Sequence, residues 1–338
     1  DTLPYTTLFR SGFISDRYGR KRNMVFALFF VSVLLLISAS FPIWEIFLTT
    51  RIFIGLAVSG VAAVAMTYIG EEIAQKDIGF AMGLYISGTA IGGMGGRLIA
   101  GVLVDFISWQ SATYIIGFLN LIIACLFYFL LPKSQHFKPY PFRFSRFKDA
   151  FEQNLKDSKL RILFAQGFIL MGCLVTVFNY ISYHLLEAPF HLSQAWIGVI
   201  SIAYLAGIYS SPKAAQWGFK YGRDKVLPMM LMTMMIGLWF TLIPSLWSIL
   251  IGLIIFAFSF FAAHSTASSW VSVQAVQYRA VASSLYLFCY YIGSSLLGSF
   301  GGLVWEQFGW IGINLSVSVV LLIGLVSALY LGKLQRSA

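Results

Sequence analysis

Residues 12–43 read GFISDRYGRKRNMVFALFFVSVLLLISASFPI, a short basic segment followed at once by a long apolar one. The apolar part, 24–43, contains no charged side chain. A hydrocarbon core about 30 Å thick needs about 20 helical residues at about 1.5 Å each. The stretch therefore predicts a membrane-spanning helix that begins directly after a basic loop.

The whole chain repeats this alternation of basic breaks and apolar runs. Its 338 residues are 59% hydrophobic and only 11% charged, with a mean hydropathy of +0.80. Soluble domains carry about 25% charged residues, so this composition predicts an all-α membrane protein. Ten runs are long enough to cross the bilayer: 24–43, 45–69, 79–104, 109–131, 160–185, 195–213, 226–243, 247–270, 280–304 and 310–332.

The distribution of cations predicts the topology. The net charge is +10, and all but three of the 23 Lys and Arg residues fall in alternate breaks between runs or at their ends. The remaining breaks, near 44, 105, 187, 245 and 306, contain neither residue type. By the positive-inside rule the basic breaks, the long break at 132–159 and the C-terminus face the cytoplasm. This placement argues against a nucleic-acid partner, and the three Cys, each inside an apolar run, show no metal or disulfide spacing.

An internal repeat divides the chain. Tyr18-Gly19-Arg20 recurs as Tyr221-Gly222-Arg223, Ala81-x-x-Leu84-Tyr85 recurs as Ala282-x-x-Leu285-Tyr286, and Trp109 has its counterpart in Trp310. Parallel repeats of this kind build transporter folds, with the solute site between the halves. Four Trp at predicted outer ends are interpreted as interfacial residues: Trp44, Trp109, Trp247 and Trp310.

The loop Gly12-Phe-Ile-Ser-Asp16-Arg17-Tyr-Gly19-Arg20-Lys-Arg resembles the loop between the second and third helices of the major facilitator superfamily. The resemblance covers Gly12 to Leu334 and implies the major facilitator fold, with ten of an expected twelve transmembrane helices in two pseudo-symmetric six-helix halves. It also implies a gating loop that docks near Val281. Gly19 would allow its tight turn. The expected gating residues are Gly12, Asp16, Arg17, Gly19 and Arg20, with Glu71 or Glu72 as the partner of Arg20. The alternative is an ordinary basic loop on the cytoplasmic side.

Two arginines lie within predicted spans, where a charge is costly and suggests function. Leu48-x-x-Arg51-x-x-x-Gly55 resembles the fourth-helix motif of the superfamily, which implies proton coupling through Arg51. The alternative is an arginine that extends to the nearby outer interface. Arg97 is expected to anchor an anionic substrate or to pair with an acid on the first two helices of the fold, which the chain is expected to lack.

The stretch from Gly88 to Arg97 resembles the fifth-helix motif of drug:proton antiporters and the arabinose-efflux branch, although Gly93 stands in place of the proline and Arg97 in place of the final glycine. Its glycines Gly88, Gly92 and Gly96 share one helix face and predict close helix packing. Weaker candidates for the solute site are the polar side chains Asn179, Tyr183, His264 and Tyr286. His264 is a possible proton site, and packing is the alternative for it.

The predicted organisation is a translated sequencing adapter at 1–11, a first half at 12–131 that lacks its first two helices, a cytoplasmic linker at 132–159 and a six-helix second half at 160–334. The predicted function is secondary transport across the bacterial inner membrane, with export of a small organic solute or drug by proton antiport. Uptake of a sugar or organic anion by proton symport is the alternative. No phosphate-binding loop or group of catalytic residues is present in the sequence, so we expect that the protein uses no ATP, cofactor or metal and is not an enzyme. We also expect it to be a monomer.

Overall fold

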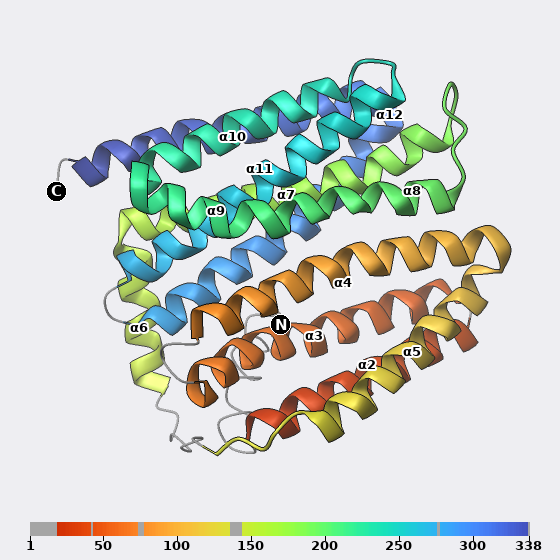
Figure 1. Ribbon diagram of the computed structural model, residues 1–338, viewed down its shortest axis with the longest axis horizontal. Coiled ribbons are helices and arrows are strands. Elements are labelled where there is room, and N and C mark those ends of the chain that lie inside the picture. Colours follow the sequence, from red (N-terminus) through yellow and green to blue (C-terminus); the bar gives the residue numbers. More distant parts are fainter. Residues whose placement is uncertain (1–18, 42, 74–77, 136–143, 276–277, 337–338) are drawn as a thin grey trace. The chain divides into compact units, whose positions relative to one another are not determined.

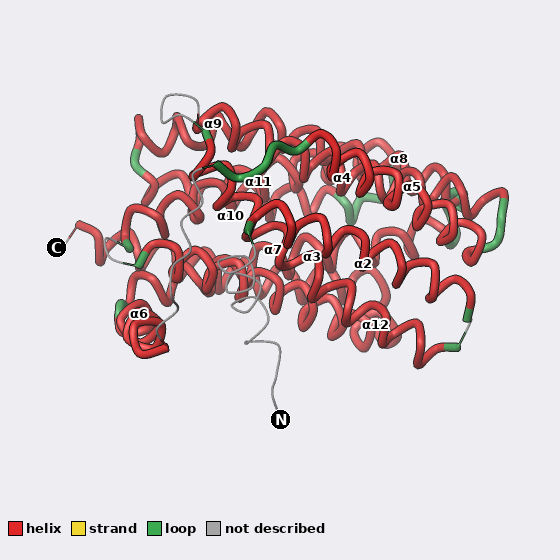
Figure 2. Tube along the Cα trace, turned by 90° about the horizontal axis from the view of Figure 1, so that it is seen from below, coloured by secondary structure: helices red, strands yellow, loops and turns green. Residues whose placement is uncertain are grey.

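The computed structural model describes residues 19–41, 43–73, 78–135, 144–275 and 278–336. Within these residues the chain is helical and contains no strand, and short loops connect the helices (Figure 2). Labels follow Figure 1. The helices are α2 (Arg20–Ser40), α3 (Trp44–Glu72), α4 (Ile78–Phe106), α5 (Trp109–Leu130), α6 (Phe144–Lys156), α7 (Ser158–Leu186), α8 (Gln194–Ile200), the 3₁₀ turn η1 (Ser201–Tyr204), α9 (Leu205–Tyr221), α10 (Arg223–Phe240), α11 (Leu246–Gln274) and α12 (Arg279–Arg336).

Nine of the ten predicted apolar runs fall mainly on a single one of these helices, and the run 195–213 spans α8, η1 and the first part of α9. Six segments of the described residues are long and apolar enough to cross a membrane. One of them, α12, has 58 residues and is interrupted at Gly309, where φ is 57° and the backbone leaves the helical region. This break separates the predicted runs 280–304 and 310–332. The all-helical membrane fold predicted from the sequence is therefore confirmed.

The linker differs from the expectation of a simple break, because it contains the helix α6. Its charged surface carries Lys148 and Glu152, whose Nζ and Oε1 atoms are 3.8 Å apart. Its other face is buried through Ala150 and Asn154, and the helix contacts α7 and α12. Asp157 then caps α7 by accepting the backbone N–H groups of residues 159 and 160. The sequence prediction missed α6 because thirteen amphipathic residues are too few to span a bilayer.

The chain divides into two compact units. The first consists of Asp1–Gly88 and Ile99–Arg143, and the second of Thr89–Leu98 and Phe144–Ala338, so the middle of α4 groups with the second unit. In the first unit, α2 packs against α3 and α5. The Asn120 amide joins α5 to α2, since its Nδ2 donates to the Leu28 carbonyl at 3.1 Å and to Ser32 Oγ at 2.8 Å.

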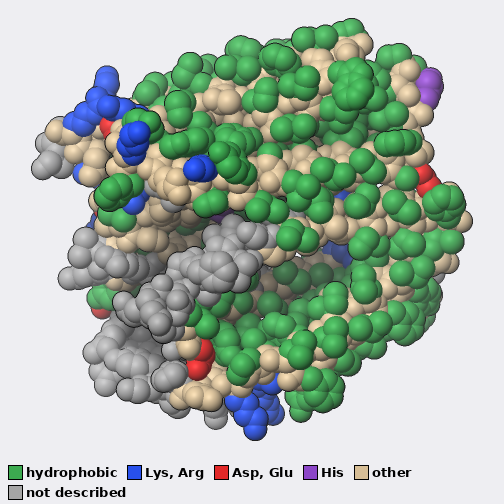
Figure 3. All heavy atoms as spheres, in the orientation of Figure 1, with side chains coloured by type: hydrophobic (Ala, Val, Ile, Leu, Met, Phe, Trp, Pro, Cys, Tyr) green, Lys and Arg blue, Asp and Glu red, His purple; other side chains and the backbone are tan. Residues whose placement is uncertain are grey.

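In the second unit, α7 packs along α12, and α11 packs against α9 and α10. Glycine allows the closest of these approaches: a Cβ on Gly293 would lie 2.0 Å from the Phe168 carbonyl oxygen. Gln166 adds a polar link between α7 and α12, donating to the Gly324 carbonyl at 2.8 Å. Hydrophobic side chains cover most of the visible face of this unit, and Lys and Arg gather toward the end where the chain terminates (Figure 3).

The sequence repeat has structural counterparts in the two units. Gly19 and Gly222 precede α2 and α10 with φ values of 91° and 93°, a region that glycine favours. Trp109 begins α5, and Trp310 follows the break at Gly309. Trp310 nevertheless is buried and donates to the Thr241 carbonyl at 3.1 Å, so the interfacial interpretation of this Trp is wrong. The sequence does not indicate that this indole is buried, because its burial depends on residues that are distant along the chain.

Candidate solute site in the second unit

The predicted gating residues lie only partly within the described chain. Gly12, Asp16 and Arg17 fall outside the described residues. Gly19 forms the turn before α2, and Arg20 begins that helix with a buried side chain. Glu71 and Glu72 form the end of α3. The proposed latch between Arg20 and these glutamates stays a prediction.

Arg51 lies near the start of α3 in an aromatic cluster. Its guanidinium carbon is 4.3 Å from the centre of the Phe47 ring. Phe47 stacks on Trp44, with ring centres 5.6 Å apart, and meets Trp109 edge to face at 5.9 Å. Cation–π contact and interfacial Trp are features of an arginine anchored at a membrane surface. These surroundings fit the alternative interpretation of Arg51, and its coupling role stays a prediction.

Arg97 lies in the part of α4 that groups with the second unit, and its head group contacts α7. Nη1 donates to the Phe178 carbonyl at 3.2 Å, and Nη2 donates to Asn179 Oδ1 at 3.1 Å. A guanidinium has five N–H donors, so these two bonds leave others available. Among the described residues no carboxylate pairs with Arg97. The arrangement can bind an anionic or hydrogen-bond-accepting group of a solute.

A continuous set of aromatic rings extends from Arg97 through the second unit. The Phe178 ring lies 5.9 Å from the Arg97 guanidinium carbon and 4.7 Å from Tyr204. Tyr204 meets Phe261 at 5.8 Å, and Phe261 meets Phe260 at 5.0 Å. Edge-to-face contacts at such distances fix the rings relative to one another. These rings carry no sequence motif, because aromatic residues are frequent in every span, and sequence reasoning missed them.

The set ends at the predicted proton site, His264 on α11. Its Nδ1 atom is 2.9 Å from the hydroxyl oxygen of Tyr286 on α12. Its ring stacks on Phe260 at 5.9 Å and lies 4.8 Å from Tyr290. Imidazole gains or loses a proton near neutral pH, and either change would alter which group donates in the bond to Tyr286. No group of three His, Cys, Asp or Glu residues in the described chain could hold a metal ion.

The remaining candidate residues lie outside the set of rings that runs from Phe178 to His264. Tyr183 lies one turn beyond Asn179 but belongs to another aromatic group, 6.0 Å from Tyr180 and 5.9 Å from Trp305. A Cβ built on Gly88, Gly92 or Gly96 would meet no atom within 4 Å among the described residues. The predicted close packing at these glycines stays a prediction, and a Cβ on Gly93 would lie 3.7 Å from the Tyr204 ring.

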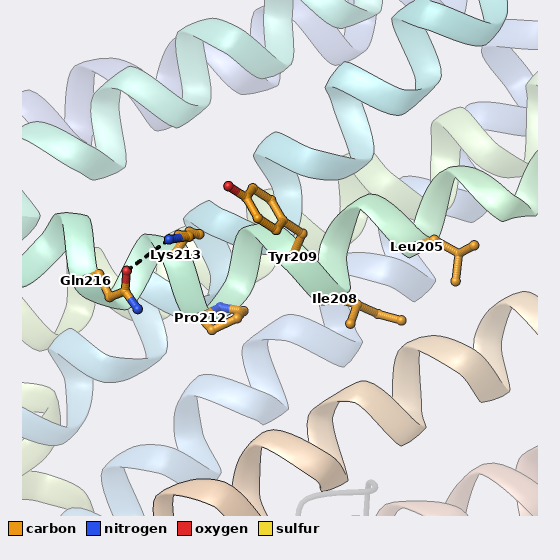
Figure 4. Close-up of a pocket in the computed structure, with 6 residues that line it drawn as sticks. All are labelled: Leu205, Ile208, Tyr209, Pro212, Lys213 and Gln216. Atoms are coloured by element: carbon orange, nitrogen blue, oxygen red, sulfur yellow. Dashed lines mark hydrogen bonds between the residues drawn. The ribbon is translucent and has the colours of Figure 1, made fainter.

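A further groove, of about 420 Å³, runs along α9. Its lining comes from this one helix, with the apolar Leu205, Ile208 and Pro212 beside Tyr209, Lys213 and Gln216 (Figure 4). Lys213 Nζ is 3.4 Å from Gln216 Oε1, so its head group is turned along the helix. Because no second element contributes, the groove is the surface of a helix and not a convergent site.

Comparison with known proteins decides the family. The profile of the Major Facilitator Superfamily matches residues 6–298. This chain belongs to the Major Facilitator Superfamily. The resemblance stated from the loop motif is thus confirmed at the level of the superfamily, and the protein is a membrane transporter.

Individual members of the superfamily extend the comparison. The inner membrane transport protein YnfM of Escherichia coli (strain K12) is 47% identical over 316 residues, which are 94% of this chain and 76% of that protein. The multidrug resistance protein MdtG of Proteus mirabilis (strain HI4320) is 28% identical over 221 residues, 64% of this chain and 54% of MdtG. The crystal structure of FucP in the outward conformation matches 97% of this chain and 86% of its own, with a TM-score of 0.67 and 13% identity. The last comparison shows the fold alone.

Proposed function

We propose that this transporter exports a small organic solute across the bacterial inner membrane in exchange for protons. The observation that carries the proposal is the 2.9 Å contact between His264 and Tyr286 inside two membrane-spanning helices. An ionisable side chain at that depth is costly and is by default a candidate functional group, and protonation of an imidazole changes which ring nitrogen can accept a hydrogen bond. The antiporter-like stretch from Gly88 to Arg97 and the similarity to MdtG support export.

In this proposal, Arg97 and the aromatic rings beside it bind the solute, and His264 carries the proton. Phe178, Tyr204 and the rings beyond them connect the two positions within one unit. A change in the protonation of His264 reorients the hydroxyl of Tyr286 and is transmitted along packed rings to the solute. The transporter would act as a monomer by alternating access, with the linker and the C-terminus in the cytoplasm.

Uptake of an organic anion with a proton is the second candidate, and one observation favours it. Arg97 has hydrogen-bond donors beyond its contacts with Phe178 and Asn179 and no carboxylate partner among the described residues. The Arg97 guanidinium is only partly buried, and a partly desolvated guanidinium attracts an anion more strongly than one in bulk water. The anionic nature of a solute would suit either direction of transport, so direction must be measured.

Proteoliposomes that contain a pH-sensitive dye test both candidates. A solute gradient is imposed at equal pH, with cationic, neutral and anionic compounds in turn. Inward solute flux that makes the lumen alkaline supports antiport, and inward flux that makes it acidic supports symport. Solute flux without any change of lumenal pH contradicts proton coupling.

The variant His264→Gln tests the proton site itself. We expect it to exchange labelled for unlabelled solute as the wild type does, because that exchange needs no net proton movement. It should fail to change the lumenal pH, since glutamine cannot ionise. His191→Gln is the matched control, because His191 is exposed in the loop between α7 and α8. Proton movement retained by His264→Gln would exclude this residue.

A further inference from the structure

A pocket of about 550 Å³ lies at the start of α2, wholly within the first unit, whereas the proposed solute site belongs to the second unit. Part of its lining comes from the first turns of α2. The rest comes from the end of α5 and the residues that follow, including Tyr128, Lys133 and Ser134. By the predicted topology this end of α2 faces the cytoplasm, at the level of the lipid headgroups. The pocket shares Gly19 and Arg20 with the predicted gating loop, but none of its lining residues belongs to the proposed solute or proton site.

The electrostatics of the pocket favour an anion. Arg20, Lys21 and Arg22 are the first three residues of α2, and Lys133 adds a fourth cation. The helix has no acidic residue in its first turn and no side-chain cap. Its backbone dipole places further positive charge at the same end. Cations grouped at the positive end of a helix dipole attract an anion to that end.

Two contacts show that the polar part of the pocket is organised. Lys21 Nζ donates to the Leu131 carbonyl and lies 5.4 Å from the centre of the Tyr128 ring, which holds the ammonium group at the pocket. Ser134 Oγ is buried and has no hydrogen-bond partner among the described residues. A buried hydroxyl without a partner costs free energy, and an anion in the pocket would supply an acceptor for it.

The other side of the pocket is apolar and continues along α2. Val25, Phe26 and Phe29 contribute to the lining. Phe26 is 68% exposed and stacks on Phe30, which is 37% exposed, with their ring centres 6.1 Å apart. A free phosphate would use only the basic part of this surface. A phosphate attached to an acyl chain would use both parts, because cations beside the ends of spans attract anionic lipids.

We propose that this pocket binds an anionic phospholipid. Its phosphodiester headgroup lies among Arg20, Lys21 and Lys133 and accepts a hydrogen bond from Ser134. Its acyl chain lies along the face of α2 that carries Phe26 and Phe30. The ligand is a lipid and not a soluble phosphate ester, because the apolar surface continues directly from the basic one.

Native mass spectrometry of the detergent-solubilised full chain tests the site. Dioleoyl phosphatidylglycerol is titrated against dioleoyl phosphatidylcholine, which has the same acyl chains and no net charge. We expect tighter binding of the anionic lipid. The double variant Lys21→Gln/Lys133→Gln should weaken that binding about 30-fold at low salt, since each cation near a membrane surface contributes on the order of 1 kcal/mol.

The control is Lys156→Gln/Lys220→Gln, which removes the same charge from two exposed lysines on the predicted cytoplasmic side. It should bind the anionic lipid as the wild type does. Equal loss in both double variants would show an unspecific charge effect and overturn the site. Equal binding of the two lipids would also overturn it. Competition by free glycerol phosphate at the affinity of the lipid would reject the acyl-chain part of the proposal. Melting curves of both variants verify that each is folded.

Discussion

The two arginines inside predicted spans have different surroundings. Arg51 lies over the ring of Phe47, beside Trp44 and Trp109, within the first unit. Arg97 donates to a backbone carbonyl and to Asn179, within the second unit. The first is the environment of an anchor near an interface, where the charge can reach water. The second is that of a binding group, whose geometry is fixed by directional bonds.

This difference shows what makes an intramembrane charge useful. A ring face holds a cation above the ring but does not direct its individual N–H groups, since the attraction is between the whole charge and the ring quadrupole. Hydrogen bonds from two nitrogens of one guanidinium fix its plane and direct the remaining donors. We therefore infer that Arg97 carries solute binding and that Arg51 contributes chiefly to placing α3 in the bilayer.

Removal of each charge should separate the two roles most strongly. We expect Arg97→Gln to lower the transport of anionic solutes on the order of 100-fold, because glutamine leaves the solute charge without a partner. Arg51→Gln should transport at close to the wild-type rate. Uptake of labelled solute into proteoliposomes at equal protein content measures both. A large loss in Arg51→Gln accompanied by lost pH coupling would restore the coupling role that its sequence motif suggests.

The partners of the two arginines should show a smaller contrast. Asn179→Ala removes one hydrogen bond that orients Arg97, and a bond of this kind contributes about 1 kcal/mol, or about a fivefold change in transport. Phe47→Leu, the corresponding change beside Arg51, should leave transport unchanged. The apparent affinity for solute is the informative readout. A loss confined to turnover, with affinity intact, would contradict a binding role of the pair.

Backbone placement gives the smallest expected contrast. A Cβ on Gly198 would lie 3.1 Å from the carbonyl oxygen of Arg97 and 3.1 Å from the Cα of Leu98, whereas one on Gly55 would meet nothing within 4 Å among the described residues. Gly198→Ala should therefore shift the middle of α4 and cost about 1 kcal/mol of stability, with transport lowered about twofold. Gly55→Ala should change neither. Thermal unfolding in detergent and solute uptake check the pair, and identical behaviour would mean that α8 does not position Arg97.

The sequence determined the class of the protein and most of its helices. Long apolar runs must become helices in lipid because no water is available to pair with their backbone groups. For that reason the runs 24–43 and 247–270 coincide with α2 and α11 to within a few residues. The loop motif at Gly12 identified the superfamily, and the repeat located equivalent turns at Gly19 and Gly222. These features depend on local composition and spacing, which the sequence displays directly.

Only the tertiary structure decided which polar side chains lie together. His264 and Tyr286 were separate candidates in the sequence, and the packing of α11 on α12 joins them. Asn179 meets Arg97 across 82 positions, while Tyr183, one turn away, joins a different group. The small amphipathic helix α6 and the burial of Trp310 were likewise decided by packing. Hydrophobicity determines that a helix crosses the membrane. It does not determine which face of the helix packs against a neighbouring helix, because in lipid every face of such a helix is apolar.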